Sequence, residues 1–158
     1  VKYLTQQNIS IIVPNAGDTF YLGSATVYVL APITNNDTIS DNNRSIVLRI
    51  VYGNTSFLLT GDAEYDEEYE ILNSGTILNS TLLEVAHHGS NSSTSYHWLR
   101  EVEPQFAIIS VGGNAYGHPT EEVLSRLRDA DVVVYRTDLN GDIIVTSDGT
   151  NIAVTPSR

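Results

Sequence analysis

The sequence contains neither cysteine nor methionine, and Lys2 is the only lysine among its 158 residues. Without cysteine the chain cannot form a disulfide, a thiolate metal site or a cysteine nucleophile, although this leaves its redox compartment undetermined. No apolar run approaches the about 18 residues of a membrane-spanning helix. Because the sequence starts at Val1 with no initiator methionine and no signal-peptide pattern, we expect an excised or processed piece of a longer chain.

Basic residues are also scarce, since 19 acidic residues face 8 basic ones and the net charge is −11. Such a surface repels nucleic acid and anionic lipid at long range, which argues against a simple electrostatic binding module. A bound divalent cation reverses the field around it, so a metal site is the local exception. Hydrophobic residues make up 41% of the chain, which excludes a disordered tail.

The pattern of apolar residues predicts one domain over residues 1–158, with no repeats and no linker. The strongest hairpin signal is the two-residue connection Gly53-Asn54 between two β-branched runs, and a polar loop covers residues 34–43. The alternation of strands with later helices predicts a layered α/β fold with a mixed sheet. We expect strands over residues 19–22, 25–30, 45–52, 55–59, 82–86, 106–111, 132–135, 142–146 and 151–154, and helices over residues 63–72, 94–102 and 121–129.

Two of these strands run directly into polar residues that carry chemistry. The strand over residues 57–59 ends in Thr-Gly-Asp, where Asp62 either caps the next helix, its commoner use, or serves as a metal-bridging carboxylate. The strand that starts at residue 82 ends in His87-His88-Gly-Ser. Adjacent side chains of an extended chain point to opposite faces, so one histidine can face a site while the other supports it. Which histidine faces the site stays open.

A third strand is followed by a loop with three glycines between residues 112 and 117, which ends in His118-Pro119. Such a loop either approaches a ligand closely, with Asn114 and His118 as contacts, or is a glycine-rich turn. It lacks the spacing of a nucleotide P-loop. All three features follow strands, where α/β folds build their sites, and Asp and His side chains suit Zn²⁺ or Mn²⁺. Two or three ligands are nevertheless too few for a dinuclear hydrolytic site.

Five motifs follow one another along the chain: NNRSIVL at residues 42–48, FLLTGD at 57–62, EVAHHGS at 84–90, ISVGGNAYGHP at 109–119 and VYRTD at 134–138. In this order, the motifs resemble the ComEC branch of the metallo-β-lactamase superfamily over nearly the whole chain. The resemblance implies a metallo-β-lactamase-type αββα sandwich that holds two Zn or Mn ions in the complete domain. It also implies a metal-dependent nuclease or phosphodiesterase linked to bacterial DNA uptake.

The resemblance assigns roles residue by residue. Asp62 matches the bridging carboxylate, and either His87 or His88 matches the last metal-ligating histidine. Asn43 stands where many superfamily members have a further histidine. The residues implied in substrate binding are His118, Asn114, Ser90 at the site rim and, as phosphate contacts, Arg44 and Arg136, although exposed structural arginine is the commoner role of the last two.

The sequence departs from the superfamily pattern in lacking H-x-H-x-D-H, which supplies most metal ligands. None of its four histidines, His87, His88, His97 and His118, forms that motif. We therefore expect this chain to be the C-terminal portion of the hydrolase domain, to bind metal weakly alone and to be inactive alone. The implied partners are DNA or a small phosphodiester, the missing N-terminal half and a membrane channel domain on the same polypeptide. The implied location is secreted or on the extracytoplasmic face of a bacterial membrane.

Two alternative functions stay open. The first is a hydrolase of the same fold that acts on a small phosphodiester, phosphorylcholine or a lactone. The negative charge favours this alternative, because DNA nucleases usually keep basic residues near their groove. The second is a non-catalytic half-domain that assembles with a partner through an exposed hydrophobic sheet face.

Overall fold

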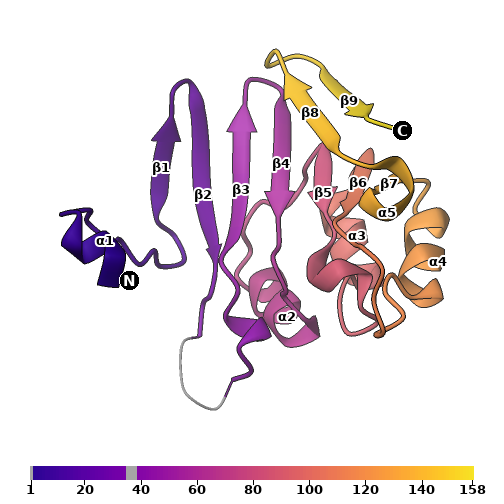
Figure 1. Ribbon diagram of the computed structural model, residues 1–158, viewed down its shortest axis with the longest axis horizontal. Helices are drawn as coiled ribbons and strands as arrows, with labels where there is room; N and C mark the ends of the chain where they lie inside the picture. The colour runs from indigo at the N-terminus through magenta and orange to yellow at the C-terminus, as the bar shows by residue number, and fades with distance from the viewer. Residues whose placement is uncertain (1, 35–38) are drawn as a thin grey trace.

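A computed structural model describes residues 2–34 and 39–158. Seven strands form one mixed sheet in which the spatial order follows the sequence order, β1 to β7 (Figure 1). The α/β class and the mixed sheet expected from the sequence are confirmed. The strands are β1 (Thr19–Leu22), β2 (Ala25–Ala31), β3 (Val47–Tyr52), β4 (Thr55–Leu59), β5 (Leu82–Glu84), β6 (Phe106–Ile109) and β7 (Val133–Arg136).

The first four strands form an antiparallel meander. The β3–β4 hairpin turns at Gly53, whose φ of +57° suits a primed turn. A Cβ atom at this position would lie 2.2 Å from the carbonyl oxygen of Gly149, and the N–H of Asn54 donates to that oxygen at 2.7 Å. Gly149 lies in a second hairpin, over residues 143–156. Gly53 therefore allows this second hairpin to approach the turn closely.

The last four strands are parallel, and a helix connects each neighbouring pair. The helices are α2 (Tyr65–Asn73), α3 (Tyr96–Val102) and α4 (Glu121–Asp129). All three pack their apolar side chains into one buried cluster with strands β2 to β6, so they cover the same face of the sheet. Burying this cluster is the main stabilising contribution to the fold. Its largest fully buried side chains include Trp98, Leu58, Ile71, Leu83, Ile109 and Leu127.

Several features lie outside the expected pattern. A short helix α5 (Thr137–Asn140) follows β7, so the next strand does not continue the main sheet. Instead β8 (Ile143–Ser147) and β9 (Ile152–Pro156) pair with each other in a separate two-stranded sheet. Helix α1 (Lys2–Gln6) was not predicted and lies beyond the β1 edge of the sheet (Figure 1). The 3₁₀ turns η1 (Asn42–Arg44) and η2 (Ala86–Gly89) complete the elements.

The other expectations about secondary structure agree closely with the structure, apart from strand and helix ends that shift by one or two residues. Residues 35–38 of the polar loop expected over 34–43 lie outside the described residues. In the described part of the chain, no helix combines the length and the apolar character needed to cross a membrane.

Candidate functional site

The polar residues that follow β4, β5 and β6 meet at one edge of the sheet. These strands are parallel neighbours, so their carboxyl ends lie side by side. Asp62 follows β4, the histidine pair follows β5, and the glycine-rich loop follows β6. The structure therefore brings together the three segments that the sequence singled out.

The histidine pair does not adopt the extended backbone on which the sequence argument relied. His87 and His88 have φ of 49° and 55°, and Gly89 has φ of +81°, so three successive residues are left-handed. This conformation costs about 1 kcal/mol or more for each non-glycine residue. The N–H of His87 donates to the carbonyl of Gly61 at 2.9 Å, which ties the turn to the β4 end. The two side chains diverge because of this turn and not because of strand alternation.

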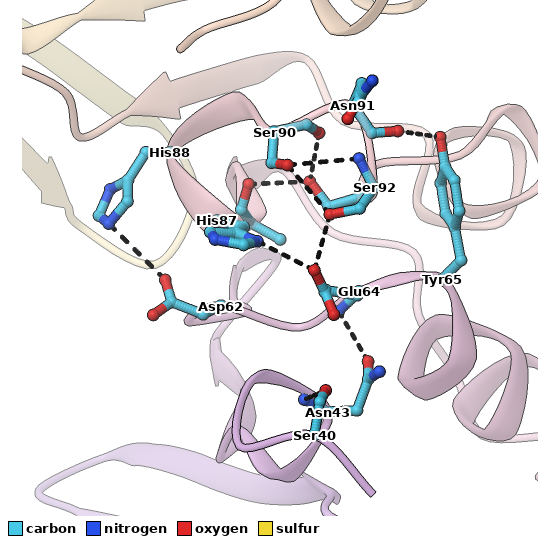
Figure 2. Close-up of polar contacts among 12 residues, drawn as sticks. Ser40, Asn43, Asp62, Glu64, Tyr65, His87, His88, Ser90, Asn91 and Ser92 are labelled. Atoms are coloured by element: carbon cyan, nitrogen blue, oxygen red, sulfur yellow. Dashed lines mark hydrogen bonds and ion pairs between the residues drawn. The ribbon is translucent and has the colours of Figure 1, made fainter. Parts of the chain in front are cut away.

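His88 faces Asp62 (Figure 2). Its Nδ1 lies 2.6 Å from the carbonyl oxygen of Ser110, and since a carbonyl only accepts, Nδ1 carries a proton. The opposite ring nitrogen, Nε2, lies 3.7 Å from Oδ1 of Asp62, and both side chains are about half exposed. Nε2 therefore either forms an ion pair with Asp62 or presents its lone pair to a cation that both groups share.

His87 faces a different carboxylate, that of Glu64 (Figure 2). Its Nδ1 lies 3.4 Å from Oε1 of Glu64. The Nδ1 atom of His87 is buried and, among the described residues, has no hydrogen-bond partner. The same Oε1 accepts a hydrogen bond from Oγ of Ser92 at 2.8 Å. Glu64 thus connects the histidine turn to the serine-rich segment after it. Glu64 was not among the residues expected at the site, although its place two residues after Asp62 was a usable signal.

The side chain that caps helix α2 is Asn43. Its Oδ1 accepts hydrogen bonds from the N–H groups of Glu64 at 3.0 Å and Glu67 at 3.3 Å. Asp62 makes no such contact, so of its two expected roles the capping role is wrong. The N–H of Asp62 instead donates to Oγ of Ser45 at 3.1 Å, which leaves its carboxylate directed at His88.

Glu84, at the end of β5, positions the turn before Asp62. Its Oε2 accepts hydrogen bonds from the N–H groups of Thr60 at 3.0 Å and Gly61 at 3.3 Å. Burial raises the pKa of Glu84 above its usual range, and these N–H donors oppose the rise. The sequence placed Glu84 inside a buried-type strand and did not identify this role.

The glycine-rich loop is held by the side chain of Asn114. Its Nδ2 donates to the carbonyls of Gly112 and His118, and its Oδ1 accepts from the N–H groups of Tyr116 and His118. Asn114 therefore organises the loop that carries His118, and a direct substrate contact through Asn114 stays a prediction.

His118 lies beside the histidine pair, with its ring centroid 5.6 Å from that of His87. Burial and the proximity of His87 and His88 lower the pKa of His118, which favours its neutral imidazole. The loop and His88 enclose a cavity of about 440 Å³. The lining residues are His88, Ser110, Val111, Gly112, Gly113, Asn114, Tyr116, His118 and Thr137.

Other residues expected at the site have partners within the protein. Oγ of Ser90 lies 3.0 Å from Oγ of Ser92, near Glu64. Arg44 pairs with Asp41, and Arg136 forms a two-pronged ion pair with Asp138. These pairs match the structural alternative for both arginines, and phosphate contacts from Arg44 or Arg136 stay predictions.

Two buried carboxyl groups lie on α2 behind the site. Glu68 accepts hydrogen bonds from the N–H groups of Thr94 and Ser95, which fixes the segment before α3. Glu67 is 2% exposed, and neither of its carboxyl oxygens has a hydrogen-bond partner among residues 2–34 and 39–158. Burial raises the pKa of Glu67 to about 8. Glu67 is therefore mostly protonated at pH 7.

The donor chemistry at Asp62 and His88 fits part of a metal site. Two ligands bound at about 2.0–2.2 Å to one zinc ion are at most about 4.2 Å apart, so their 3.7 Å separation is compatible with a shared ion. A ligating histidine usually donates its other ring N–H to a carbonyl or carboxylate, as His88 does to Ser110. Over residues 2–34 and 39–158, however, no group of three or more His, Cys, Asp or Glu is arranged for a metal ion. The pair needs additional ligands.

The fold and this edge together define an α/β protein with histidines and carboxylates gathered at the carboxyl ends of parallel strands. The chain is similar to segments of three bacterial proteins. It is 37% identical to ComE operon protein 3 of Bacillus subtilis over 139 residues. This match covers 87% of this chain and 18% of that protein. It is 44% identical over 105 residues to competence protein ComA of Neisseria gonorrhoeae, covering 65% of this chain and 15% of that protein.

Recombination protein 2 of Haemophilus influenzae is 36% identical over 131 residues, covering 82% of this chain and 16% of that protein. The chain thus spans less than a fifth of the length of each of these three relatives. No family model matches the chain. The similarity to competence proteins agrees with the ComEC part of the resemblance, and the metallo-β-lactamase part stays a prediction.

Proposed function

We propose that this chain forms part of a bacterial DNA-uptake protein and contributes Asp62 and His88 to a metal-dependent phosphodiesterase site that cleaves DNA. The observation that carries the proposal is the arrangement of His88, whose Nδ1 is anchored on Ser110 while Nε2 faces Asp62 at 3.7 Å. The names of the relatives support the DNA-uptake context, since one is a competence protein and another a recombination protein.

Each residue of the site has a task in this proposal. A bound Zn²⁺ or Mn²⁺ supplies Lewis-acid chemistry at the phosphate. Asp62 and His88 hold the ion, and Glu84 fixes the backbone of the turn before Asp62 through its hydrogen bonds to Thr60 and Gly61. His118 lines the adjoining cavity, where its imidazole donates or accepts a hydrogen bond with substrate oxygen.

The incomplete ligand set leads to a second part of the proposal. In this proposal the remaining ligands lie outside this chain, because its sequence lacks the H-x-H-x-D-H motif and its described residues provide a pair and no cluster of three. This chain alone therefore binds metal weakly and does not cleave DNA at stoichiometric metal. Cleavage by this chain alone under those conditions would show that its own residues complete the site.

The test is a cleavage assay on a longer polypeptide in which a segment with the H-x-H-x-D-H motif precedes this chain. We expect DNA cleavage with Mn²⁺ or Zn²⁺ and loss of cleavage with Asp62→Asn or His88→Asn. The matched control is Asp66→Asn, because Asp66 is an exposed carboxylate four residues from Asp62. Equal cleavage by Asp62→Asn and the parent protein contradicts the proposal.

The choice of substrate is tested in the same assay. The net charge of −11 disfavours a long polyanion and favours a small phosphodiester. Plasmid DNA, single-stranded oligonucleotides and a panel of small phosphodiesters are compared at equal metal concentration. If the protein hydrolyses the small phosphodiesters but not DNA, the nuclease proposal is wrong and the alternative, a hydrolase of small phosphodiesters, replaces it.

A further inference from the structure

Tyr116 is an exposed aromatic side chain beside the proposed metal site. It is 83% exposed, the most exposed of the large hydrophobic side chains in the described part of the chain. Its ring stacks on His118 with centroids 5.8 Å apart and an interplanar angle of 30°. The remaining face of the tyrosine ring is open to solvent, so it is available to another planar group.

The loop fixes the backbone that carries this ring. Asn114 accepts the N–H of Tyr116 at 3.0 Å and makes three further hydrogen bonds to the loop backbone. Beyond the loop, the N–H of Thr120 donates to the carbonyl of Gly89 at 2.9 Å, which ties the loop to the histidine turn. The backbone of Tyr116 is therefore held relative to the histidine turn, which lowers the entropic cost of binding a ligand at its side chain.

Tyr116 and His88 line the same cavity of about 440 Å³. A planar group stacked on the cavity side of Tyr116 would therefore share this cavity with His88. The basic residue at the end of β7, Arg136, is already paired with Asp138. Affinity for a nucleotide at this edge must then come largely from stacking rather than from charge.

We propose that Tyr116, supported by His118, is a stacking platform for an unpaired nucleobase next to the phosphate that the site cleaves. This inference rests on the proposed function and assigns a base-binding subsite to it. Stacking needs an open π-face and tolerates every base, whereas paired bases in a duplex offer no free face. The subsite therefore selects single-stranded ends or frayed strands over intact duplex and over phosphodiesters that lack a base.

The test measures binding to this chain without metal, so that it does not depend on cleavage. The probes are a short oligothymidylate and an abasic oligonucleotide of equal length, titrated by NMR. Stacking on an aromatic side chain predicts that Tyr116→Ala weakens oligothymidylate binding by about tenfold or more. Tyr116→Trp retains it, and the abasic strand binds the parent chain as weakly as oligothymidylate binds Tyr116→Ala.

The control is Tyr21→Ala, because Tyr21 is 80% exposed on β1, at the far side of the sheet (Figure 1). The affinity of the Tyr21→Ala variant for oligothymidylate should equal that of the parent chain. Equal binding by Tyr116→Ala and the parent, equal binding of abasic and thymidine strands, or no saturable binding by the parent chain each overturns the stacking platform. None of these results bears on cleavage, and loss of cleavage in Asp62→Asn leaves the stacking result unaffected.

Discussion

The amide oxygen of Asn43 accepts hydrogen bonds from the backbone N–H groups of Glu64 and Glu67, and so satisfies the first turn of α2 from a distant part of the chain. Helix N-termini leave backbone N–H groups without partners, and a side chain that accepts from them stabilises the helix. Because Asn43 has this role, the carboxylate of Asp62 is free to face His88. The helix and the site are thus connected through one asparagine.

Asn43→Ala removes this cap. We expect the free energy of unfolding to fall by roughly 1–2 kcal/mol, the usual loss for a capping side chain. Urea denaturation measures it. The control is Asn73→Ala, an exposed residue whose side chain donates to the Tyr69 carbonyl at the other end of α2 and whose loss should stay within about 0.5 kcal/mol. Equal stability of the two variants would contradict the capping role.

Gly89→Ala tests the docking of the histidine turn on the loop after β6. A Cβ at this position would lie 2.5 Å from Cβ of Pro119, and the φ of +81° is strained for alanine. We expect a loss of roughly 2 kcal/mol or more in the free energy of unfolding, with shifts of the His87 and His118 NMR signals. Gly113→Ala has open space around its Cβ and should be nearly neutral. Similar losses in both variants would show that the turn and the loop are not closely packed.

Glu67 predicts a particular dependence of stability on pH. Burial raises the folded-state pKa to about 8, while the unfolded value stays near 4.5. Below pH 4.5 both states are protonated, and between pH 4.5 and 8 only the unfolded state releases the proton, so the free energy of unfolding falls as pH rises. Glu67→Gln removes this contribution. The free energy of unfolding of the variant, relative to that of the parent, should therefore rise by roughly 3 kcal/mol between pH 4.5 and 7.

Urea denaturation of both proteins across this pH range provides the measurement. Glu68 and Glu84 also have raised pKa values, but they are present in both proteins and cancel in the difference. Asp66→Asn, on the exposed side of the same helix, should show no such change relative to the parent. A pH-independent difference between Glu67→Gln and the parent would show that Glu67 is solvated in the folded chain.

The elements that depend on local sequence were predictable. The apolar stripe of Val123, Leu124 and Leu127 indicated α4, and β-branched, aromatic and apolar residues indicated β1 and β4. Parallel strands between helices also gave the edge at which Asp62 meets the histidines. These features follow from patterns within about ten residues.

The details of the site depend on contacts between distant residues, which a local pattern does not contain. The left-handed backbone of His87 is held by a hydrogen bond to Gly61, and the cap of α2 comes from a residue 21 positions before Glu64. The proposed choice of His88 over His87 rests on Ser110, directly after β6, whose carbonyl accepts from the His88 ring. Only the folded chain reveals these relationships.

The most direct test of the account is Mn²⁺ titration of this chain monitored by NMR line broadening. The central claim is that Asp62 and His88 hold one divalent cation together, and it predicts weak binding with broadening centred on these two residues. Asp62→Asn should abolish this local broadening, whereas His97→Asn, which changes a histidine on α3, should preserve it. Broadening that is spread over the acidic surface, or that persists unchanged in Asp62→Asn, would contradict the claim.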